Sequence, residues 1–338
     1  MSTQPPLIGV IGAGAWGTAL AQMAASNGTP VVLWAYEAEV VAAINTDHAN
    51  PLYLPSVSLA PTIGATGDLA DLAKCDIVLA VTPAQVLGRV LADLAAAPRD
   101  LVLCSKGIDA SSGELMNDVA RRAVPASTIA VLSGPTFAHE VAAGLPTAVT
   151  LACSGGEAQW QRLAPALSRP TFRLYYSDDV TGAEIGGAIK NVLAIACGVV
   201  EGLALGQNAR AALIARGFSE MLRFGEALGA RSETLAGLCG LGDLVLTCSS
   251  TASRNFSFGR ALGEGARAAD LLADRRTVAE GAFTAPVLAR LAAEHGVAMP
   301  IVSAVNDLLQ GADARAVVAA LMARPLKAEL HAVRDDPA

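Results

Sequence analysis

The sequence predicts an α/β fold in which a doubly wound parallel sheet is followed by an all-α second domain. Short apolar runs alternate with helical patterns over the first 179 residues, and such alternation is typical of parallel sheets. After that point apolar runs of strand length nearly vanish and long helical patterns take over. A chain of 338 residues also exceeds the usual size of one core. We therefore expect two domains, residues 1–179 and 180–338.

The elements can be placed in order along the chain. Strands are predicted at six apolar runs, residues 7–11, 31–34, 76–81, 101–104, 128–132 and 147–153. Helices are predicted between them at residues 15–26, which Asn27 and Gly28 end, and at residues 84–97. The proline-rich residues 50–61 predict a surface loop. In the second domain, helices are predicted at residues 181–205, 210–228 and 278–295.

The composition restricts the class of protein. Hydrophobic residues make up 53% of the chain, charged residues 16% and aromatic residues 4%, so Ala, Val, Leu and Gly must fill the interior. The net charge of -7 argues against a broad basic surface for nucleic acid, and any phosphate site must be local. None of the four histidines stands at ligand spacing, so we expect no metal site.

Cysteine usage and the apolar stretches predict a cytoplasmic protein. The six cysteines are scattered and include no Cys-X-X-Cys pair, as expected for reduced thiols. Residues 7–25 are apolar but contain regular glycines, and the first basic residue is Lys74, so they do not read as a signal peptide. The apolar residues 185–200 are interrupted by Lys190 and Asn191, so we expect no membrane span.

A glycine pattern follows the first predicted strand. Gly12, Gly14 and Gly17 lie between that strand and the first helix, as in dinucleotide-binding Rossmann-like domains. There the first glycine allows a tight turn, the second lets the backbone approach a pyrophosphate, and the third lets helix and strand pack closely. The alternative is a glycine-rich turn without a ligand.

The coenzyme type depends on the end of the second strand. An acidic residue about 20 positions after the glycines binds the ribose 2′-hydroxyl of NAD, whereas a basic residue accommodates the 2′-phosphate of NADP. The sequence here is Ala35, Tyr36, Glu37. Glu37 suits NAD, but a solvated carboxylate at a helix start accounts for it equally well. NAD and NADP therefore both remain candidates.

Lys190 is the first candidate for chemistry. Its helix is apolar on nearly every side, so the ammonium group is expected to be buried and its pKa lowered. A lysine of lowered pKa can transfer a proton to a carbonyl oxygen. Gly186, one turn earlier, is expected to leave room for a substrate on the same face. The alternative is a lysine that extends its amine to a domain surface.

Further charged residues follow in the second domain and at the sheet edge. Asp243 can pair with Lys190, and Arg254 offers a planar fork for a phosphate. Each also has a simpler interpretation, a helix N-cap for Asp243 and a solvated charge for Arg254. Lys106 and residues 134–136 come directly after predicted strands, at the edge where open α/β sheets bind ligands.

With these motifs, the sequence resembles over nearly its whole length the bacterial-type NAD(P)-dependent glycerol-3-phosphate dehydrogenases. Motifs of that family occur here in the same order after the glycine turn. They are Thr-Ala-Leu at residues 18–20, Lys-Gly at 106–107, Ser-Gly-Pro-Thr-Phe-Ala at 133–138, Gly-Ala-X-Lys-Asn at 187–191, Gly-Leu-Gly-Asp-Leu at 240–244 and Ser-Arg-Asn at 253–255. Agreement of this many ordered motifs by chance is negligible.

The resemblance implies roles for individual residues. Lys190 is implied as the proton donor and acceptor, with Asp243 as its catalytic partner. The implied substrate contacts are Lys106, Gly134, Thr136, Lys190, Asp243, Ser253, Arg254 and Asn255. The implied coenzyme contacts are Gly12, Gly14, Ala15, Trp16, Gly17, Tyr36, Lys106, Ala138, Arg254, Val278 and Glu280.

The resemblance also implies an activity. The enzyme would reduce dihydroxyacetone phosphate reversibly to sn-glycerol 3-phosphate with NADH or NADPH, and so supply the glycerol phosphate backbone of phospholipids. A homodimer is implied as well. Two rival functions are a relative acting on another small acid, such as a 3-hydroxyacid or opine dehydrogenase, and a regulator that binds NAD(H) without turnover. Enzymes of the first kind lack the paired cations for a phosphate. A regulator without turnover would leave Lys190 and Asp243 without a purpose.

Three positions depart from what is common in that family. Ala15 stands where a hydroxyl is frequent, Tyr36 where Arg or His is frequent, and His139 where Lys is frequent. The first two concern the coenzyme only. They leave the substrate assignment intact and argue against strong NADP selectivity, so both coenzymes are expected to work.

Overall fold

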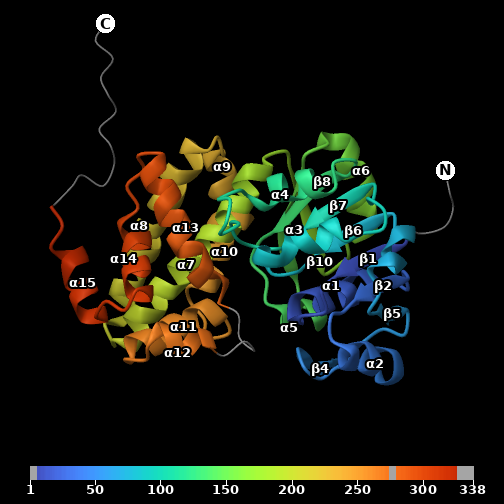
Figure 1. Cartoon of the computed structure of the whole chain (residues 1–338), viewed down its shortest axis with the longest axis horizontal. Coiled ribbons are helices and arrows are strands. Elements are labelled where there is room, and N and C mark those ends of the chain that lie inside the picture. Colours follow the sequence, from blue (N-terminus) through green and yellow to red (C-terminus); the bar gives the residue numbers. More distant parts are fainter. Residues whose placement is uncertain (1–5, 274–278, 326–338) are drawn as a thin grey trace, which may run out of the picture.

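The structure is a computed structural model that describes residues 6–273 and 279–325. Figure 1 shows two lobes side by side, a sheet with helices around it and a cluster of helices. The last strand ends at Ser177, and the long helix that opens the helical lobe begins at Val180. The predicted fold class, a Rossmann-like α/β sheet followed by helices, is confirmed.

The main sheet has eight strands in the order β10-β9-β8-β7-β6-β1-β2-β5. The central strands were predicted from their apolar runs, and all are fully or almost fully buried because helices cover both faces of the sheet. The bounds of all eight strands are β1 Ile8–Ile11, β2 Val31–Trp34, β5 Ile63–Thr66, β6 Ile77–Ala80, β7 Asp100–Leu103, β8 Thr128–Ser133, β9 Thr147–Cys153 and β10 Phe172–Ser177.

One pairing departs from the predicted parallel sheet, because β9 runs antiparallel to β8. Between the two strands lies only the short helix α5 (Ala138–Ala142). A parallel crossover needs a longer connection, usually a helix that runs back along the sheet. The next connection contains the twelve-residue helix α6 (Gly156–Leu167), and β10 accordingly pairs parallel with β9.

The predicted surface loop at residues 50–61 was wrong in part. Strands β3 (Ala49–Asn50) and β4 (Leu54–Ser58) form a separate antiparallel hairpin there. Pro55 is compatible with a strand here because a two-stranded hairpin has only edge strands. The chain then continues into β5, which joins the main sheet parallel to β2.

Two hydrophobic cores lie on the two faces of the sheet. Along β1, Ile8 and Val10 belong to one core and Ile11 to the other, as the alternation of side chains along a strand requires. The helices around the sheet, besides α5 and α6, are α1 Ala15–Ala25, α2 Ala38–Asp47, α3 Ala84–Ala92 and α4 Met116–Ala123, with the short turn η1 Leu69–Lys74.

Helix α7 (Val180–Gly202) is the centre of the helical lobe. Two glycine contacts bring it into backbone contact with α11 (Arg254–Gly263). A Cβ on Gly198 would lie 2.1 Å from the carbonyl oxygen of Phe256, and one on Gly259 would lie 2.0 Å from that of Ile195. The other elements of this lobe are α8 Gly206–Ala227, α9 Ser232–Leu235, η2 Leu238–Gly242, α10 Asp243–Thr247, α12 Ala268–Ala273, α13 Glu280–Glu294, α14 Pro300–Leu309 and α15 Ala314–Met322.

Helix α7 is longer than the apolar stretch recognised in the sequence. With 23 residues it is long and apolar enough to cross a membrane by length and composition. The apolar residues 185–200 noted in the sequence fell short of a membrane span. The apolar window of α7 is completely buried inside the protein, against the other helices of the lobe. The composition of α7 therefore reflects its position in a core.

A buried carboxyl group joins the two lobes. The Glu184 side chain of α7 accepts a hydrogen bond from the backbone N–H of Asn117, at 2.7 Å, in the first turn of α4. Carboxylates stabilise helix N-termini, whose N–H groups lack partners within the helix. Burial nevertheless raises the pKa of Glu184 to about 8. The contact therefore fixes α4 against α7 with a group that holds its proton near neutral pH.

Glu184→Gln tests the energetic effect of this group. Because the folded protein binds the Glu184 proton more tightly than the unfolded chain does, the group makes folding less favourable as pH rises from about 4.5 to about 8. The glutamine variant keeps an acceptor oxygen for Asn117 but has no proton to lose. We measure the free energy of unfolding by urea titration between about pH 5 and 9. Over this range the value for the variant should decline less than that for the unaltered protein, by on the order of a few kcal/mol.

The matched control is Glu226→Gln at an exposed position of α8. It should leave the pH profile of the unfolding free energy parallel to that of the unaltered protein. A parallel profile for Glu184→Gln as well would contradict the prediction.

Candidate active site

The glycine turn between β1 and α1 is shaped to receive an anion. Gly12 has φ 107°, a conformation that favours glycine. A Cβ on Gly17 would lie 1.8 Å from the carbonyl oxygen of Gly12, whereas nothing lies within 4 Å of a Cβ on Gly14. No side chain in the described part of the chain caps the first turn of α1. Its N–H groups and helix dipole therefore face open space, as in a pyrophosphate site.

Buried polar atoms adjoin this turn. Trp16 Nε1 and Thr82 Oγ1 have no hydrogen-bond partner among the described residues. Thr82 follows β6, and its backbone nitrogen lies 3.3 Å from the position of a Cβ on Gly12. Because buried polar groups are normally hydrogen-bonded, both atoms fit a site that a bound molecule completes. The open space at Gly14 and these two atoms together fit a dinucleotide coenzyme.

The other predicted coenzyme residues lie around the same edge of the sheet. Tyr36 follows β2 and is 83% exposed. Glu37 is the residue at the start of α2, but its side chain makes no cap, and Oε1 accepts a hydrogen bond from the Tyr53 hydroxyl at 2.7 Å. Ala15 is the first residue of α1, and Ala138 is the first residue of α5.

Lys190 is buried, as its apolar helix predicts. It is 5% exposed. Its Nζ lies 2.5 Å from Asp243 Oδ1 and donates to Thr247 Oγ1 at 2.9 Å. The pairing that the sequence suggested for Asp243 is therefore present. Asp243 itself is fully buried as the first residue of α10, and its alternative role as a helix N-cap was wrong because Gly242 is the N-cap.

A second lysine binds the same carboxylate. Lys106, after β7, places Nζ 2.7 Å from Asp243 Oδ2 and 3.5 Å from the carbonyl oxygen of Gly134. Each oxygen of Asp243 thus pairs with an ammonium group from a different lobe. Two cations against one carboxylate leave a local positive charge in a protein whose net charge is -7. An anionic ligand is favoured at this position.

The charges around the carboxylate change the pKa values of the two lysines. Burial, opposed by the charge of Asp243 and reinforced by that of Lys106, lowers the pKa of Lys190 to about 8. Burial also disfavours the charged form of Lys106, but the charge of Asp243 and the hydrogen bond to it keep the pKa of Lys106 above its ordinary value. Lys190 is therefore the group of the pair that titrates near neutral pH.

Two of the predicted substrate residues, Thr136 and Ser253, have hydroxyl groups that contact the protein's own backbone. Thr136 Oγ1 lies 3.3 Å from the carbonyl oxygen of Gly134. Ser253 caps α11 by accepting the N–H of Phe256 at 3.3 Å, and Arg254 is the exposed first residue of that helix. These residues place a serine hydroxyl and a guanidinium at one helix N-terminus.

Asn255 is committed to contacts inside the protein. Its Nδ2 donates to Asn191 Oδ1 at 3.0 Å, and its Oδ1 accepts the N–H of Gly281 at 2.9 Å. It therefore joins α7, α11 and the start of α13. Glu280 begins α13, and burial raises its pKa against the opposing charges of Arg254 and Lys106. Val278, another predicted coenzyme residue, lies outside the described residues.

Gly186 does not leave room for a substrate, contrary to the prediction. A Cβ there would lie 2.5 Å from the carbonyl oxygen of Cys239, so the backbone of η2 occupies that space. The glycine beside the lysine pair is Gly187, whose Cβ would lie 3.2 Å from Ser133 Oγ and 3.5 Å from Lys106 Cγ. The face of α7 beside the paired lysines therefore contains Gly187. The four-residue spacing from Lys190 had indicated Gly186.

Two polar side chains of the site were not predicted. Thr247 bonds both Lys190 and Asp243. It stands four residues after Asp243, and this helical spacing was a signal that could have identified it. The Ser133 hydroxyl is buried without a hydrogen-bond partner in the described part of the chain. Its place at the end of the core strand β8 gave no comparable signal.

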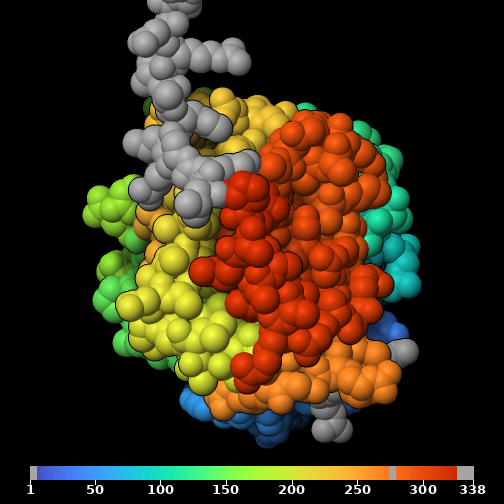
Figure 2. Space-filling model, turned by 90° about the vertical axis from the view of Figure 1, so that its left-hand side faces the viewer, coloured from blue at the N-terminus to red at the C-terminus, as the bar shows by residue number. Residues whose placement is uncertain are grey.

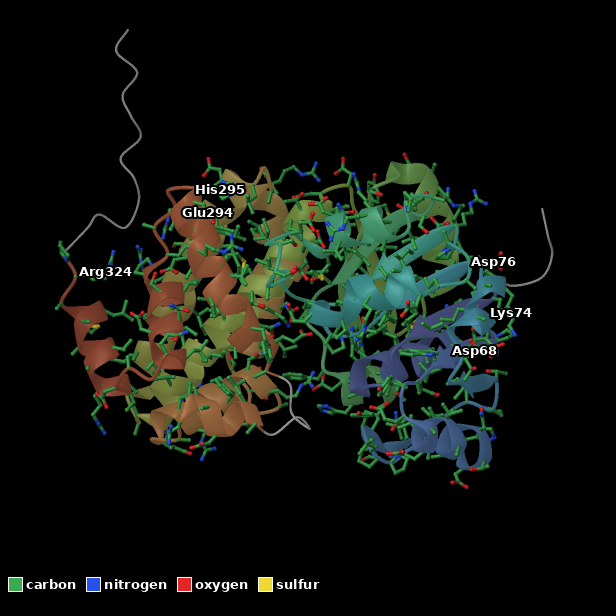
Figure 3. The ribbon with its side chains drawn as sticks, viewed as in Figure 1. Asp68, Lys74, Asp76, Glu294, His295 and Arg324 are labelled. Atoms are coloured by element: carbon green, nitrogen blue, oxygen red, sulfur yellow. The ribbon has the colours of Figure 1, made fainter. Side chains whose placement is uncertain are left out.

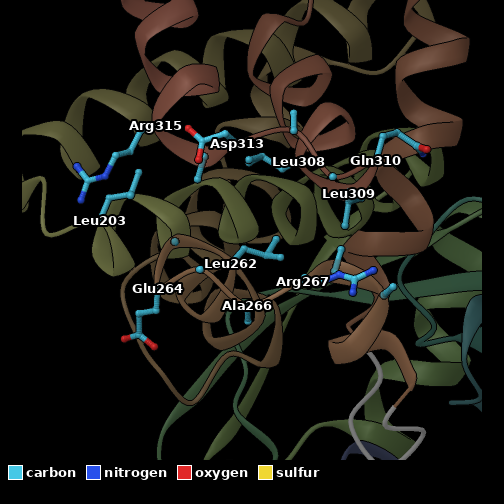
Figure 4. A pocket seen from close by; sticks show the side chains of 17 residues that line it. Leu203, Leu262, Glu264, Ala266, Arg267, Leu308, Leu309, Gln310, Asp313 and Arg315 are labelled. Carbon is cyan, nitrogen blue, oxygen red and sulfur yellow. The ribbon is translucent and has the colours of Figure 1, made fainter.

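A separate hollow lies in the helical lobe away from these residues. It has a volume of about 740 Å³ between the turn that follows α11 and helices α14 and α15. Its charged lining residues include Glu264, Arg267 and Asp313, which point in different directions in Figure 4. The paired lysines do not line it. Within residues 6–273 and 279–325, no group of three or more His, Cys, Asp or Glu residues could hold a metal ion.

Comparison with known proteins supplies an independent result. Residues 7–159 match the family model of the NAD-dependent glycerol-3-phosphate dehydrogenase N-terminus, and residues 179–319 match that of its C-terminus. A glycerol-3-phosphate dehydrogenase [NAD(P)+] of Erythrobacter litoralis is 72% identical over 95% of this chain and 97% of its own length. One of Novosphingobium aromaticivorans is 70% identical over 95% and 98%. The crystal structure of glycerol-3-phosphate dehydrogenase from Coxiella burnetii covers 95% of this chain and 99% of its own, with 38% identity and a TM-score of 0.89.

Proposed function

We propose a mechanism for this chain from the premise that it belongs to the NAD-dependent glycerol-3-phosphate dehydrogenase family. The chain is an oxidoreductase acting on a CH–OH group, and it interconverts dihydroxyacetone phosphate and sn-glycerol 3-phosphate with NAD(H) or NADP(H). The observation that carries the mechanism is the buried Lys190 ammonium on a carboxylate shared with Lys106.

Lys190 is the general acid and base of this mechanism. When bound, the nicotinamide coenzyme supplies or accepts the hydride. In reduction, the ammonium group of Lys190 donates a proton to the oxygen of the substrate carbonyl, and in oxidation the neutral amine takes it from the hydroxyl. Asp243 and Thr247 hold the Lys190 Nζ in place, and its pKa near 8 lets it serve in both directions.

The two lobes divide the work in this proposal. Residues 1–179 supply most of the coenzyme contacts, and residues 180–338 carry the acid–base group, but each lobe also adds residues to the other's site. The coenzyme contacts are Gly12, Gly14, Ala15, Trp16, Gly17, Tyr36, Lys106, Ala138, Arg254, Val278 and Glu280. The open turn at Gly14 supports this assignment, as does Trp16 Nε1, which has no hydrogen-bond partner within residues 6–273 and 279–325.

The phosphate of the substrate is bound by positive charge from both lobes. Lys106 contributes the surplus charge at Asp243, and Arg254 contributes a planar fork at the N-terminus of α11. Gly134, Thr136 and Ser253 border this position. Asn255 contributes by holding the start of α13, because both atoms of its amide already have partners.

The cellular setting is also part of the proposal. We place the enzyme in the cytoplasm, where its product supplies glycerophospholipid synthesis. All six cysteines are unpaired and buried, which supports a reducing compartment.

Lys190→Ala should abolish turnover while the coenzyme still binds. The substitution removes the proton donor and leaves the glycine turn, which lies in the other lobe, unchanged. We expect kcat to fall by about a hundredfold or more, as general acid–base groups typically contribute, while the affinity for NADH from fluorescence titration changes little. Near-normal turnover would contradict the assignment.

A pH profile supplies the control for this variant. Reduction needs the charged form of Lys190, so kcat/KM for dihydroxyacetone phosphate should decline above about pH 8. Oxidation of sn-glycerol 3-phosphate needs the neutral amine and should rise up to about the same pH. Any residual activity of Lys190→Ala should lack this inflection in both directions.

Arg254→Ala should weaken the use of the phosphorylated substrate. A charge-assisted contact contributes about 1.5 to 3 kcal/mol, so kcat/KM for dihydroxyacetone phosphate should drop at least about tenfold. Arg254→Lys should lose less, because it keeps the charge but not the fork. Unphosphorylated dihydroxyacetone is the control substrate, and an equal loss on both substrates would show that Arg254 acts only through the coenzyme or the fold and does not bind the phosphate.

We also propose that the enzyme is a homodimer. Helix α15 has no buried residue, and Met322 on it is 82% exposed. Figure 2 shows α15 and α14 beside α8 on the end face of the helical lobe. A helix without a buried residue on this face supports a protein contact there. Light scattering should give about twice the chain mass of 34.3 kDa, and a mass near the single value would contradict the dimer.

A further inference from the structure

The hairpin β3–β4 is tied to the glycine turn by one buried side chain. Asn50 is 0% exposed. Its Nδ2 donates to the carbonyl oxygen of Ala13, within the glycine turn, and to Thr18 Oγ1 on α1, both at 2.8 Å. Its Oδ1 accepts the backbone N–H of Tyr53 at 3.2 Å. The Asn50 amide nitrogen therefore fixes the hairpin to the glycine turn and α1, and its oxygen fixes Tyr53 within the hairpin.

The same hairpin holds a carboxylate at the end of β2. The Tyr53 hydroxyl donates to Glu37 Oε1 at 2.7 Å. The hydrogen bond to Glu37, followed by burial, raises the pKa of Tyr53 to about 12, so the hydroxyl stays a donor throughout the physiological range. Glu37 Oε2 has no described hydrogen bond and remains an acceptor. Asn50 and Tyr53 thus connect the phosphate-binding turn to a fixed acceptor through three consecutive contacts.

Glu37 stands where a dinucleotide places its adenosine ribose. It follows β2, the neighbour of β1 in the sheet, and lies 20 residues after Gly17. In such domains an acidic residue at this place binds the ribose 2′-hydroxyl. A carboxylate held in place accepts a hydrogen bond from that hydroxyl and repels a 2′-phosphate.

The charges of this part of the chain have one sign. The first 73 residues contain no Lys or Arg, and their acidic residues are Glu37, Glu39, Asp47, Asp68 and Asp71. Thr66, at the end of β5, bonds Asp71, and its carbonyl accepts the N–H of Ala35 beside Tyr36. Lys74 precedes β6 and so lies at the opposite, amino-terminal edge of the sheet, near Asp76 in Figure 3. This segment offers no cation to a 2′-phosphate.

We propose that Glu37, positioned by Tyr53 of the β3–β4 hairpin, makes this enzyme select NAD(H) over NADP(H). The proposal rests on the assignment of the glycine turn to the coenzyme. Glu37 contacts the ribose 2′-hydroxyl, and Tyr53 is a positioning residue that acts through Glu37. Asn50 keeps the ribose carboxylate and the pyrophosphate turn at a fixed separation.

Direct titration with NADH and NADPH, followed by fluorescence, tests the proposal without turnover. The unaltered enzyme should bind NADH at least about tenfold more tightly than NADPH, the size of one charge-assisted contact. Glu37→Gln should reduce this ratio at least about fivefold, because it removes the repulsion and weakens the acceptor. Tyr53→Phe, which lacks only the hydroxyl, should raise KM for NADH about threefold or more and leave kcat and KM for dihydroxyacetone phosphate unchanged.

Two matched variants serve as controls. Glu39→Gln removes the same charge two residues away, on the exposed part of α2, and should change the ratio by less than about twofold if contact and not distant charge decides. Tyr175→Phe makes the same change on β10, away from the coenzyme, and should have no effect. A preference for NADPH in the unaltered enzyme, or a ratio that Glu37→Gln leaves unchanged, would overturn the proposal. Failure of both coenzymes to bind would instead contradict the assignment of the glycine turn.

Discussion

The carboxylate of Asp243 is the interaction on which the active site depends. It is fully buried and receives Lys190 from the helical lobe and Lys106 from the sheet lobe. Removing an ion from water costs several kcal/mol, and only a charged partner with good geometry offsets this in an interior. Asp243 favours the charged form of both lysines. The trio therefore fixes the two lobes relative to each other and sets the charge of the site at the same time.

Burial and the surplus of one positive charge together make the pKa values of the two lysines differ. A single carboxylate can neutralise one of them, and Lys190, which is the more buried, takes the lowered pKa. Lys106 keeps its proton and so adds to the field that lowers the pKa of Lys190. The lowered pKa of Lys190 thus comes first from burial, which the charge of Asp243 opposes and the charge of Lys106 reinforces.

Sequence reasoning located the parts of this site but not their contacts. The glycine turn was predictable because each glycine has a local steric reason, and Lys190 because an ammonium group in an apolar helix is costly. The pairing of Lys106 with Asp243 joins residues 137 positions apart, and no local pattern encodes it. The same limit applies to the fold. Strands β3 and β4 and the reversed β9 depend on the short connections and the partners that each strand meets, which periodicity does not reveal.

Resemblance supplied the roles of most remaining residues, and the geometry distinguishes among them. Ser253, Arg254 and Asn255 are adjacent in one motif, yet Ser253 caps a helix, Arg254 is exposed, and Asn255 bonds α7 to α13. Asn50 does for the coenzyme lobe what Asn255 does for the substrate lobe, since each buried amide joins three segments that bear site residues. Neutral amides thus hold two of the segments that carry site residues, whereas the charged Asp243 holds the two lysines. This division also explains why a change at an amide should disturb geometry first, whereas a change at Asp243 disturbs charge.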